Sequence, residues 1–134
     1  MTIPINRESQ VSDIQREFNH LFPFLKLEFF KNKHSYGEGS PKQSKLSHYL
    51  LLHDLARELP RQINLSENMT VQELEKLFED QLGLHPQVFR KSGTLWLETT
   101  ITDSWTLKQQ NEHGMEISQS HSFPVSQARN KEEE

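Results

Sequence analysis

The sequence predicts an α+β fold, a ferredoxin-like sandwich built from two tandem βαβ units with an extra hairpin at one edge. Three observations predict it. A weak internal repeat relates residues 3–31 to residues 63–91 at an offset of 60 positions. Each copy runs through an alternating stretch, a stretch of helical periodicity and a second alternating stretch. A further alternating stretch follows the second copy across a turn.

Five identical pairs anchor the repeat when the two copies are aligned without a gap. Isolated identities arise by chance, so the shared order of the patterns carries the argument. The pairs are Ile3 with Ile63, Val11 with Val71, Phe18 with Phe78, Phe29 with Phe89, and Lys31 with Lys91.

The first copy predicts a strand, a helix and a strand. Residues 3–5 form a short alternating stretch that is typical of a strand. Apolar residues recur at spacings of three and four over residues 11–21 and form one stripe of a helix. Pro23 ends this helix because it lacks an N–H donor and its ring clashes with the preceding turn. Residues 25–29 alternate again and predict the second strand.

The second copy repeats this order, with a strand at residues 63–65 and a helix over residues 71–82. Thr70 and Glu73 form a capping box, in which the hydroxyl and the carboxylate each accept a backbone N–H. Gly83 is expected to end the helix because glycine adopts the left-handed conformation without strain.

A hairpin is expected after the second helix. Its two strands are predicted at residues 87–90 and 95–100. Residues 91–94 between them have the composition of a turn, so the two strands are expected to form a hairpin. A ubiquitin-like β-grasp is the alternative fold. Residues 62–117 are similar to the later part of that fold, most specifically at residues 105–107 (Trp-Thr-Leu).

The stretch after the hairpin predicts two short elements. Asp103 or Ser104 is expected to cap a helical turn that Gly114 ends, and residues 115–118 predict a last strand. The block QVFRKSGTLWLETTITDSWTLKQQN (residues 87–111) resembles a segment of an uncharacterised family of small bacterial proteins. The resemblance implies a recurrent protein and carries no activity with it.

One domain is expected over residues 1–118, since 134 residues is a common size for a single domain. Residues 32–45 predict a long loop because Gly, Pro and Ser are concentrated there. Residues 46–59 hold an apolar group that favours one or two helical turns on the sheet. Residues 119–134 are polar and aperiodic, and predict a disordered tail.

Composition excludes several classes of protein. Fifteen Lys and Arg against nineteen Asp and Glu give a net charge of −4, which disfavours sequence-independent binding to nucleic acid. The absence of cysteine excludes disulfides, thiolate catalysis and Cys-ligated metal sites. No apolar run approaches the roughly 20 residues of a membrane span. No signal peptide is evident either, and we expect a cytoplasmic protein.

The seven histidines do not predict a metal site. His48 and His53 are five positions apart, whereas a helix places residues four apart on one face. Zinc needs three or four convergent ligands, and the other histidines are scattered singly along the chain. No metal and no cofactor is therefore expected.

The leading functional hypothesis is a non-enzymatic module that binds a protein partner, or a second copy of itself, through the hairpin. Trp96 alternates with Leu95 and Leu97, so one side of the strand is expected to present apolar side chains away from the core. Arg90 is the cationic member of this predicted site. An edge strand with open N–H and C=O groups is a natural place for strand addition.

An anion or a small molecule bound by the Lys-rich loop over residues 31–45 is the alternative. Its glycines would let backbone N–H groups approach a phosphate. Against Glu38, four lysines give a local charge of +3; they are Lys31, Lys33, Lys42 and Lys45.

An enzyme is a third and weaker hypothesis. Glu98, Asp103 and His113 surround a Thr-rich stretch next to the hairpin and could supply acid–base groups. Threonine is also common in strands, and Asp103 is equally well explained as a helix cap.

Overall fold

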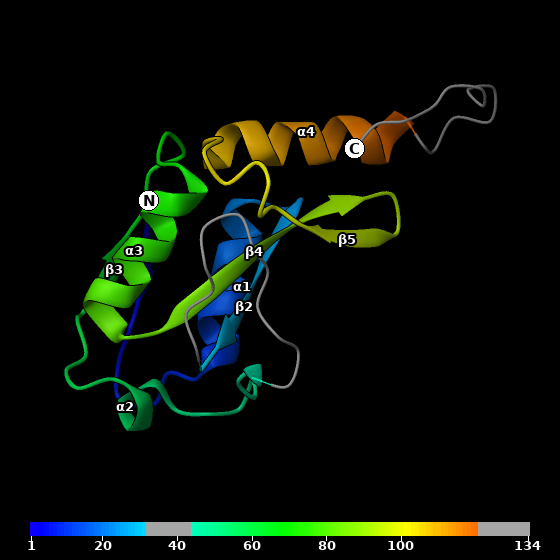
Figure 1. Ribbon diagram of the computed structural model, residues 1–134. Coiled ribbons are helices and arrows are strands. Elements are labelled where there is room, and N and C mark those ends of the chain that lie inside the picture. Colours follow the sequence, from blue (N-terminus) through cyan, green and yellow to red (C-terminus); the bar gives the residue numbers. More distant parts are fainter. Residues whose placement is uncertain (32–43, 121–134) are drawn as a thin grey trace.

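The computed structural model describes residues 1–31 and 44–120 (Figure 1). The α+β class predicted from the sequence is confirmed. The elements in chain order are β1 (Thr2–Pro4), α1 (Val11–Leu21), β2 (Leu25–Phe30), α2 (Leu52–Leu55), β3 (Gln62–Asn64), α3 (Val71–Leu82), β4 (His85–Ser92), β5 (Leu95–Glu98) and α4 (Leu107–Ser120).

Both helices of the predicted repeat form where the periodicity placed them. The Thr70 hydroxyl accepts the Glu73 N–H at 3.1 Å, and the Glu73 carboxylate accepts the Thr70 N–H at 2.8 Å. Gly83 ends α3 in the left-handed conformation, at φ 67°. The capping box and the glycine stop are therefore confirmed.

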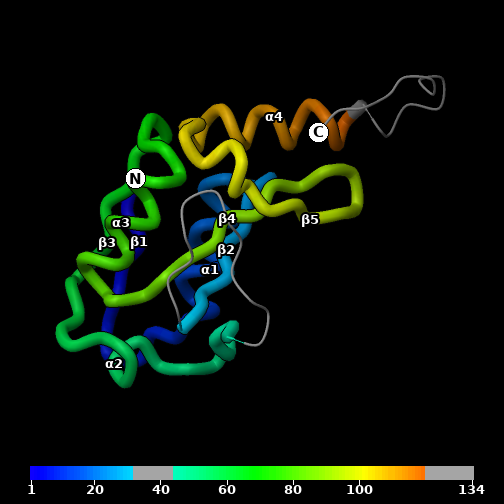
Figure 2. Tube along the Cα trace, viewed as in Figure 1, coloured from blue at the N-terminus to red at the C-terminus, as the bar shows by residue number. Residues whose placement is uncertain are grey.

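The internal repeat is a pseudo-twofold arrangement of backbone contacts. β1 pairs antiparallel with β3, and Ile3 lies opposite its repeat counterpart Ile63 (Figure 2). Ile5 donates its N–H to the carbonyl of residue 61 at 2.9 Å, and Leu65 donates to the carbonyl of Met1 at 2.8 Å. Exchanging the two copies maps each of these bonds onto the other.

The repeat extends beyond the βαβ units. After β2 the chain returns to the start of α1, where Val11 donates its N–H to Leu50 O at 2.9 Å. After β5 it returns to the start of α3, where Val71 donates to Trp105 O at 3.1 Å. We call residues 48–51 and 103–106 the return segments. Each one leads into a helix, α2 in the first half and α4 in the second. Both halves therefore contain a strand, a helix, a strand, a return segment and a second helix in the same order.

The strand arrangement differs from the single mixed sheet of a ferredoxin-like sandwich. Two antiparallel sheets form in the described part of the chain, one of β1 and β3 and one in the order β2-β4-β5. Each of the helices α1 and α3 therefore links strands of different sheets, whereas a ferredoxin-like crossover returns to the same sheet. The β-grasp alternative is not confirmed either.

The alignment of the two copies shifts by one residue within the sheet. Leu27 pairs with Val88, and both face the helices as buried residues. Phe29 packs against Phe78 of α3, with ring centroids 5.3 Å apart, but Phe89 lies on the opposite face of the sheet and is only half-buried. Phe89 therefore does not share the core position of its repeat counterpart Phe29. α3 has twelve residues against eleven in α1, and the connection to the following strand is one residue shorter after α3 than after α1.

The two short elements predicted after the hairpin are replaced by the single helix α4. Gly114 does not end a helical turn but lies inside α4, and residues 115–118 are helical. A Cβ at position 114 would lie 3.0 Å from the Phe24 Cβ and 3.0 Å from the Arg90 Cγ. The close approach of α4 to the sheet therefore favours glycine at this position, which the sequence pattern does not reveal.

The remaining predictions concern the loop and the tail. One helical turn, α2, forms within residues 46–59 as predicted, and its Leu52 is fully buried. The predicted loop over residues 32–45 and tail over residues 119–134 lie outside the described residues except at their borders. At the second border, Gln119 still belongs to α4.

The core lies between the sheets and the helices α1 and α3. Figure 1 shows α1 behind β2 and β4, while α4 crosses the end of the three-stranded sheet and packs on β4 and the start of β2. The largest fully buried side chains include Phe18, Phe29 and Phe78. No described helix combines the length and the hydropathy needed to cross a membrane.

We predict that Gly114→Val destabilises the protein by about 1–3 kcal/mol, because the added methyl groups meet Phe24 and Arg90 at the α4 contact. The measurement is the free energy of unfolding in denaturant. Glu112→Val on the exposed side of the same helix is the control and is expected to cost only about 0.5 kcal/mol, the helix propensity difference. Equal losses in the two variants would contradict the packing explanation.

We predict a pH-dependent contribution from Asp13 in the first turn of α1. Its carboxylate accepts the Gln10 N–H at 2.7 Å and pairs with Arg16, and both contacts lower the pKa of Asp13 from its usual 3.8. The contribution is present above the unfolded-state pKa and is lost as pH falls through the folded-state pKa. Asp13→Asn should therefore be less stable than the wild type at neutral pH.

The two proteins should converge in stability once the pH is below the folded-state pKa of Asp13. Denaturant unfolding at neutral pH and at a pH below that pKa measures the difference in stability between Asp13→Asn and the wild type. The exposed substitution Glu112→Gln is the control. A stability gap that stays constant with pH would contradict the assignment.

Candidate functional site

The hairpin of β4 and β5 ends in a two-residue turn, Gly93 and Thr94, with Gly93 at φ 66°. This turn is of the length that favours a positive φ, and it confirms the predicted hairpin. In Figure 1 the hairpin extends beyond the end of β2, with α4 on one side of it. Among the described strands, β5 has β4 as its only neighbour.

The backbone of β5 leaves two residues with outward-pointing polar groups. Thr99 donates its N–H to Val88 O at 3.2 Å, and bonds in an antiparallel pair are made by every second residue. Leu95 and Leu97 therefore direct their backbone groups toward β4. The N–H and C=O of Trp96 and Glu98 point to the opposite side, where no described strand lies. We call this side the free edge of β5.

The side chains of β5 divide between the two faces of the sheet. Trp96 lies on the face away from α1 and α3, with the Lys26 and Lys91 ammonium groups 5.1 and 6.0 Å from its ring centroid. Leu95 and Leu97 lie on the other face, and Leu95 is 64% exposed. The free edge therefore has an exposed leucine on one face and, on the other, a half-buried tryptophan with two cations near its ring.

Arg90 does not belong to this surface, contrary to the sequence prediction. It is buried, with 3% of its surface exposed, and its guanidinium donates to the Gln110 side-chain oxygen at 2.6 Å. The guanidinium also lies over the Trp105 ring, 5.8 Å from its centroid. Gln110 in turn donates to Thr102 O at 2.7 Å. Arg90 thus fastens α4 and the second return segment to the sheet.

The Lys-rich loop is only partly described. Lys33 and Lys42 lie outside the described residues, and Lys31 is exposed. The Lys45 ammonium lies 3.8 Å from a carboxylate oxygen of Glu28. No observation of these residues favours an anion site over a solvated loop.

Glu28 is a buried carboxylate that the sequence analysis missed. Its oxygens lie 3.3 Å from His48 Nε2 and 3.9 Å from Lys26 Nζ, and Gln15 donates to one of them at 3.2 Å. Alternation along β2 indicated only that this position faces away from the core. Lys26 on β2 and Lys45 in the chain after it compensate the buried charge, so Glu28 has a structural explanation.

The three residues of the enzyme hypothesis are not gathered into one site. Asp103 is buried and accepts a hydrogen bond from the Gln72 side chain at 2.8 Å. His113 packs edge-on against Trp105, with ring centroids 5.5 Å apart, and lines a shallow cavity of about 220 Å³. Neither Asp103 nor Glu98 lines that cavity.

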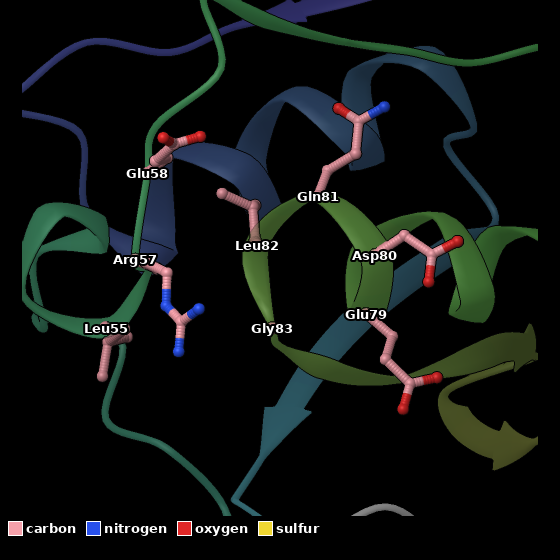
Figure 3. Close-up of a pocket in the computed structure, with 8 residues that line it drawn as sticks. All are labelled: Leu55, Arg57, Glu58, Glu79, Asp80, Gln81, Leu82 and Gly83. Carbon is pink, nitrogen blue, oxygen red and sulfur yellow. The ribbon is translucent and has the colours of Figure 1, made fainter.

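A second cavity, of about 550 Å³, lies between α2 and the end of α3 (Figure 3). Its wall combines an apolar floor with charged side chains; the lining residues are Leu55, Arg57, Glu58, Glu79, Asp80, Gln81, Leu82 and Gly83. Lys76 pairs with Asp80 at 3.1 Å. Within residues 1–31 and 44–120, no group of three or more His, Asp or Glu residues is placed to hold a metal ion.

Comparison with known proteins adds no functional evidence. No protein-family model, no curated protein and no solved structure matches the chain. The resemblance of residues 87–111 to a family of small bacterial proteins therefore stays a prediction, and the site is assigned from its geometry.

Proposed function

We propose that the chain is a non-enzymatic cytoplasmic module that binds an extended segment of a protein partner along the free edge of β5. The observation that carries this proposal is the pair of backbone positions, Trp96 and Glu98, whose N–H and C=O groups point away from β4. An added strand bonds to such groups without sequence preference, and side-chain contacts then select the partner.

The side chains beside the free edge support the same function. Leu95 is exposed and Trp96 is half-buried, so an added strand would cover apolar surface on both faces of the sheet. Tryptophan is enriched among residues that dominate binding energy. Lys26 and Lys91 next to the Trp96 ring favour an acidic group in the bound segment.

The hairpin is also held in place before binding. Gly114 lets α4 approach β4 closely, and Gly93 donates its N–H to the Ser118 hydroxyl at 3.1 Å, which ties the turn to α4. A strand that is already ordered loses little conformational entropy on binding. The buried Arg90 contributes to this order through Gln110.

We predict that Glu98→Pro lowers partner affinity by about tenfold, because proline removes an N–H from the free edge and leaves the bonds to β4 intact. The immobilised wild-type chain is used to isolate partners, and the dissociation constant of the tightest one is then measured for each variant. Leu95→Lys should weaken the same partner, because it replaces exposed apolar surface with a charge.

Tyr49→Lys is the matched control. Tyr49 is 79% exposed and lies on the first return segment, far along the chain from the hairpin. It should leave the affinity unchanged. If Glu98→Pro and Leu95→Lys bind the partner as tightly as the wild type while remaining folded, the free edge is not the binding site.

A further inference from the structure

The free edge of β5 is self-complementary, and we infer that its partner is the β5 edge of a second copy of this chain. This inference rests on the proposed function, since it names the partner of the same edge. Twofold symmetric dimers present the same patch on both subunits, so every feature of the patch must meet its own counterpart. Backbone, charge and apolar surface each satisfy this condition at β5.

The backbone pattern allows two antiparallel β5 strands to pair across a twofold axis. If the axis passes through Leu97, Trp96 of one copy lies opposite the partner's Glu98. Both of these residues point their N–H and C=O groups to the free edge, so each such pair can exchange two hydrogen bonds. The pairing extends the sheet to six strands without rearranging either copy.

Charge favours the register centred on Leu97 over the one centred on Trp96. The partner's Glu98 arrives on the face where the ammonium groups of Lys26 and Lys91 lie 5.1 and 6.0 Å from the Trp96 ring centroid. The symmetry makes the same contact twice. A register centred on Trp96 places Glu98 opposite the partner's Thr94 instead and gains no ion pair. Unlike charges on opposite strands stabilise a pair, and like charges destabilise it.

Apolar surface is covered on the other face. Leu97 of one copy lies opposite the partner's Leu97, in a position where side chains approach closely because the residues do not exchange hydrogen bonds. Leu95, which is 64% exposed, lies diagonal to the partner's Leu97. The arrangement buries the exposed leucine, which an isolated copy leaves in water.

The test is the dimer dissociation constant of the full chain, measured by sedimentation or light scattering over a range of concentrations. Lys91→Glu and Glu98→Lys should each raise it by about tenfold, because each places like charges together at two symmetric contacts. The double variant carrying both changes should return to within about threefold of the wild type. Glu98→Pro removes the N–H at both symmetric contacts, so it should be monomeric at the concentrations at which the wild type dimerises, and circular dichroism should show that it is folded.

Several outcomes would overturn the inference. A wild-type chain that is monomeric at every concentration excludes the second copy as partner; if another protein then binds the wild type but not Glu98→Pro, the proposed function still holds. A dimer that persists in Glu98→Pro and in Leu95→Lys uses a different surface. If the dimer dissociation constant of the double variant is as high as those of the two single variants, the register centred on Leu97 is excluded.

Discussion

The antiparallel pairing of β2 with β4 is the interaction on which the rest of the structure depends. It joins the two halves of the repeat at their centre, and it places Leu27 and Val88 side by side facing the helices. α1 packs against β2 and α3 against β4, so burial of the main core requires this pair. β5 and α4 then build outward from β4. Without this pair only β1 and β3 would join the strands of the two halves, and α1 and α3 would lose the shared sheet against which they pack.

The return segments solve a second constraint that both helices share. The first N–H groups of a helix have no partner within it and must be satisfied from outside. In each half the chain comes back past the start of its own helix and supplies a carbonyl, Leu50 to α1 and Trp105 to α3. The residue after each return segment is a leucine buried in the core, Leu52 or Leu107. Satisfaction of backbone groups and burial of apolar surface are thus achieved by one feature.

The two halves diverge after the return segments, and the candidate function arises from that divergence. α2 ends after one turn, whereas α4 continues for fourteen residues and packs across the end of the sheet. Arg90 and Gly114 make this contact possible, one by a buried hydrogen bond and one by the absence of a side chain. The hairpin is therefore braced by α4, while the backbone of β5 keeps one side open.

The sequence by itself determined the helices α1 and α3, because helical periodicity, the Thr70–Glu73 capping box and the Gly83 stop act between residues close in the chain. Alternation also located the hairpin and singled out Trp96 and Leu95. The tertiary structure decided which strands pair, since a short alternating stretch does not specify the strand with which it pairs. It also decided whether the side chains of Arg90, Glu28 and Phe89 are buried and on which face of the sheet they lie. The one-residue shift between the two copies within the sheet turned Phe89 outward, and the packing of α4 on the sheet buried Arg90. These outcomes depend on contacts between distant segments, which no local pattern contains.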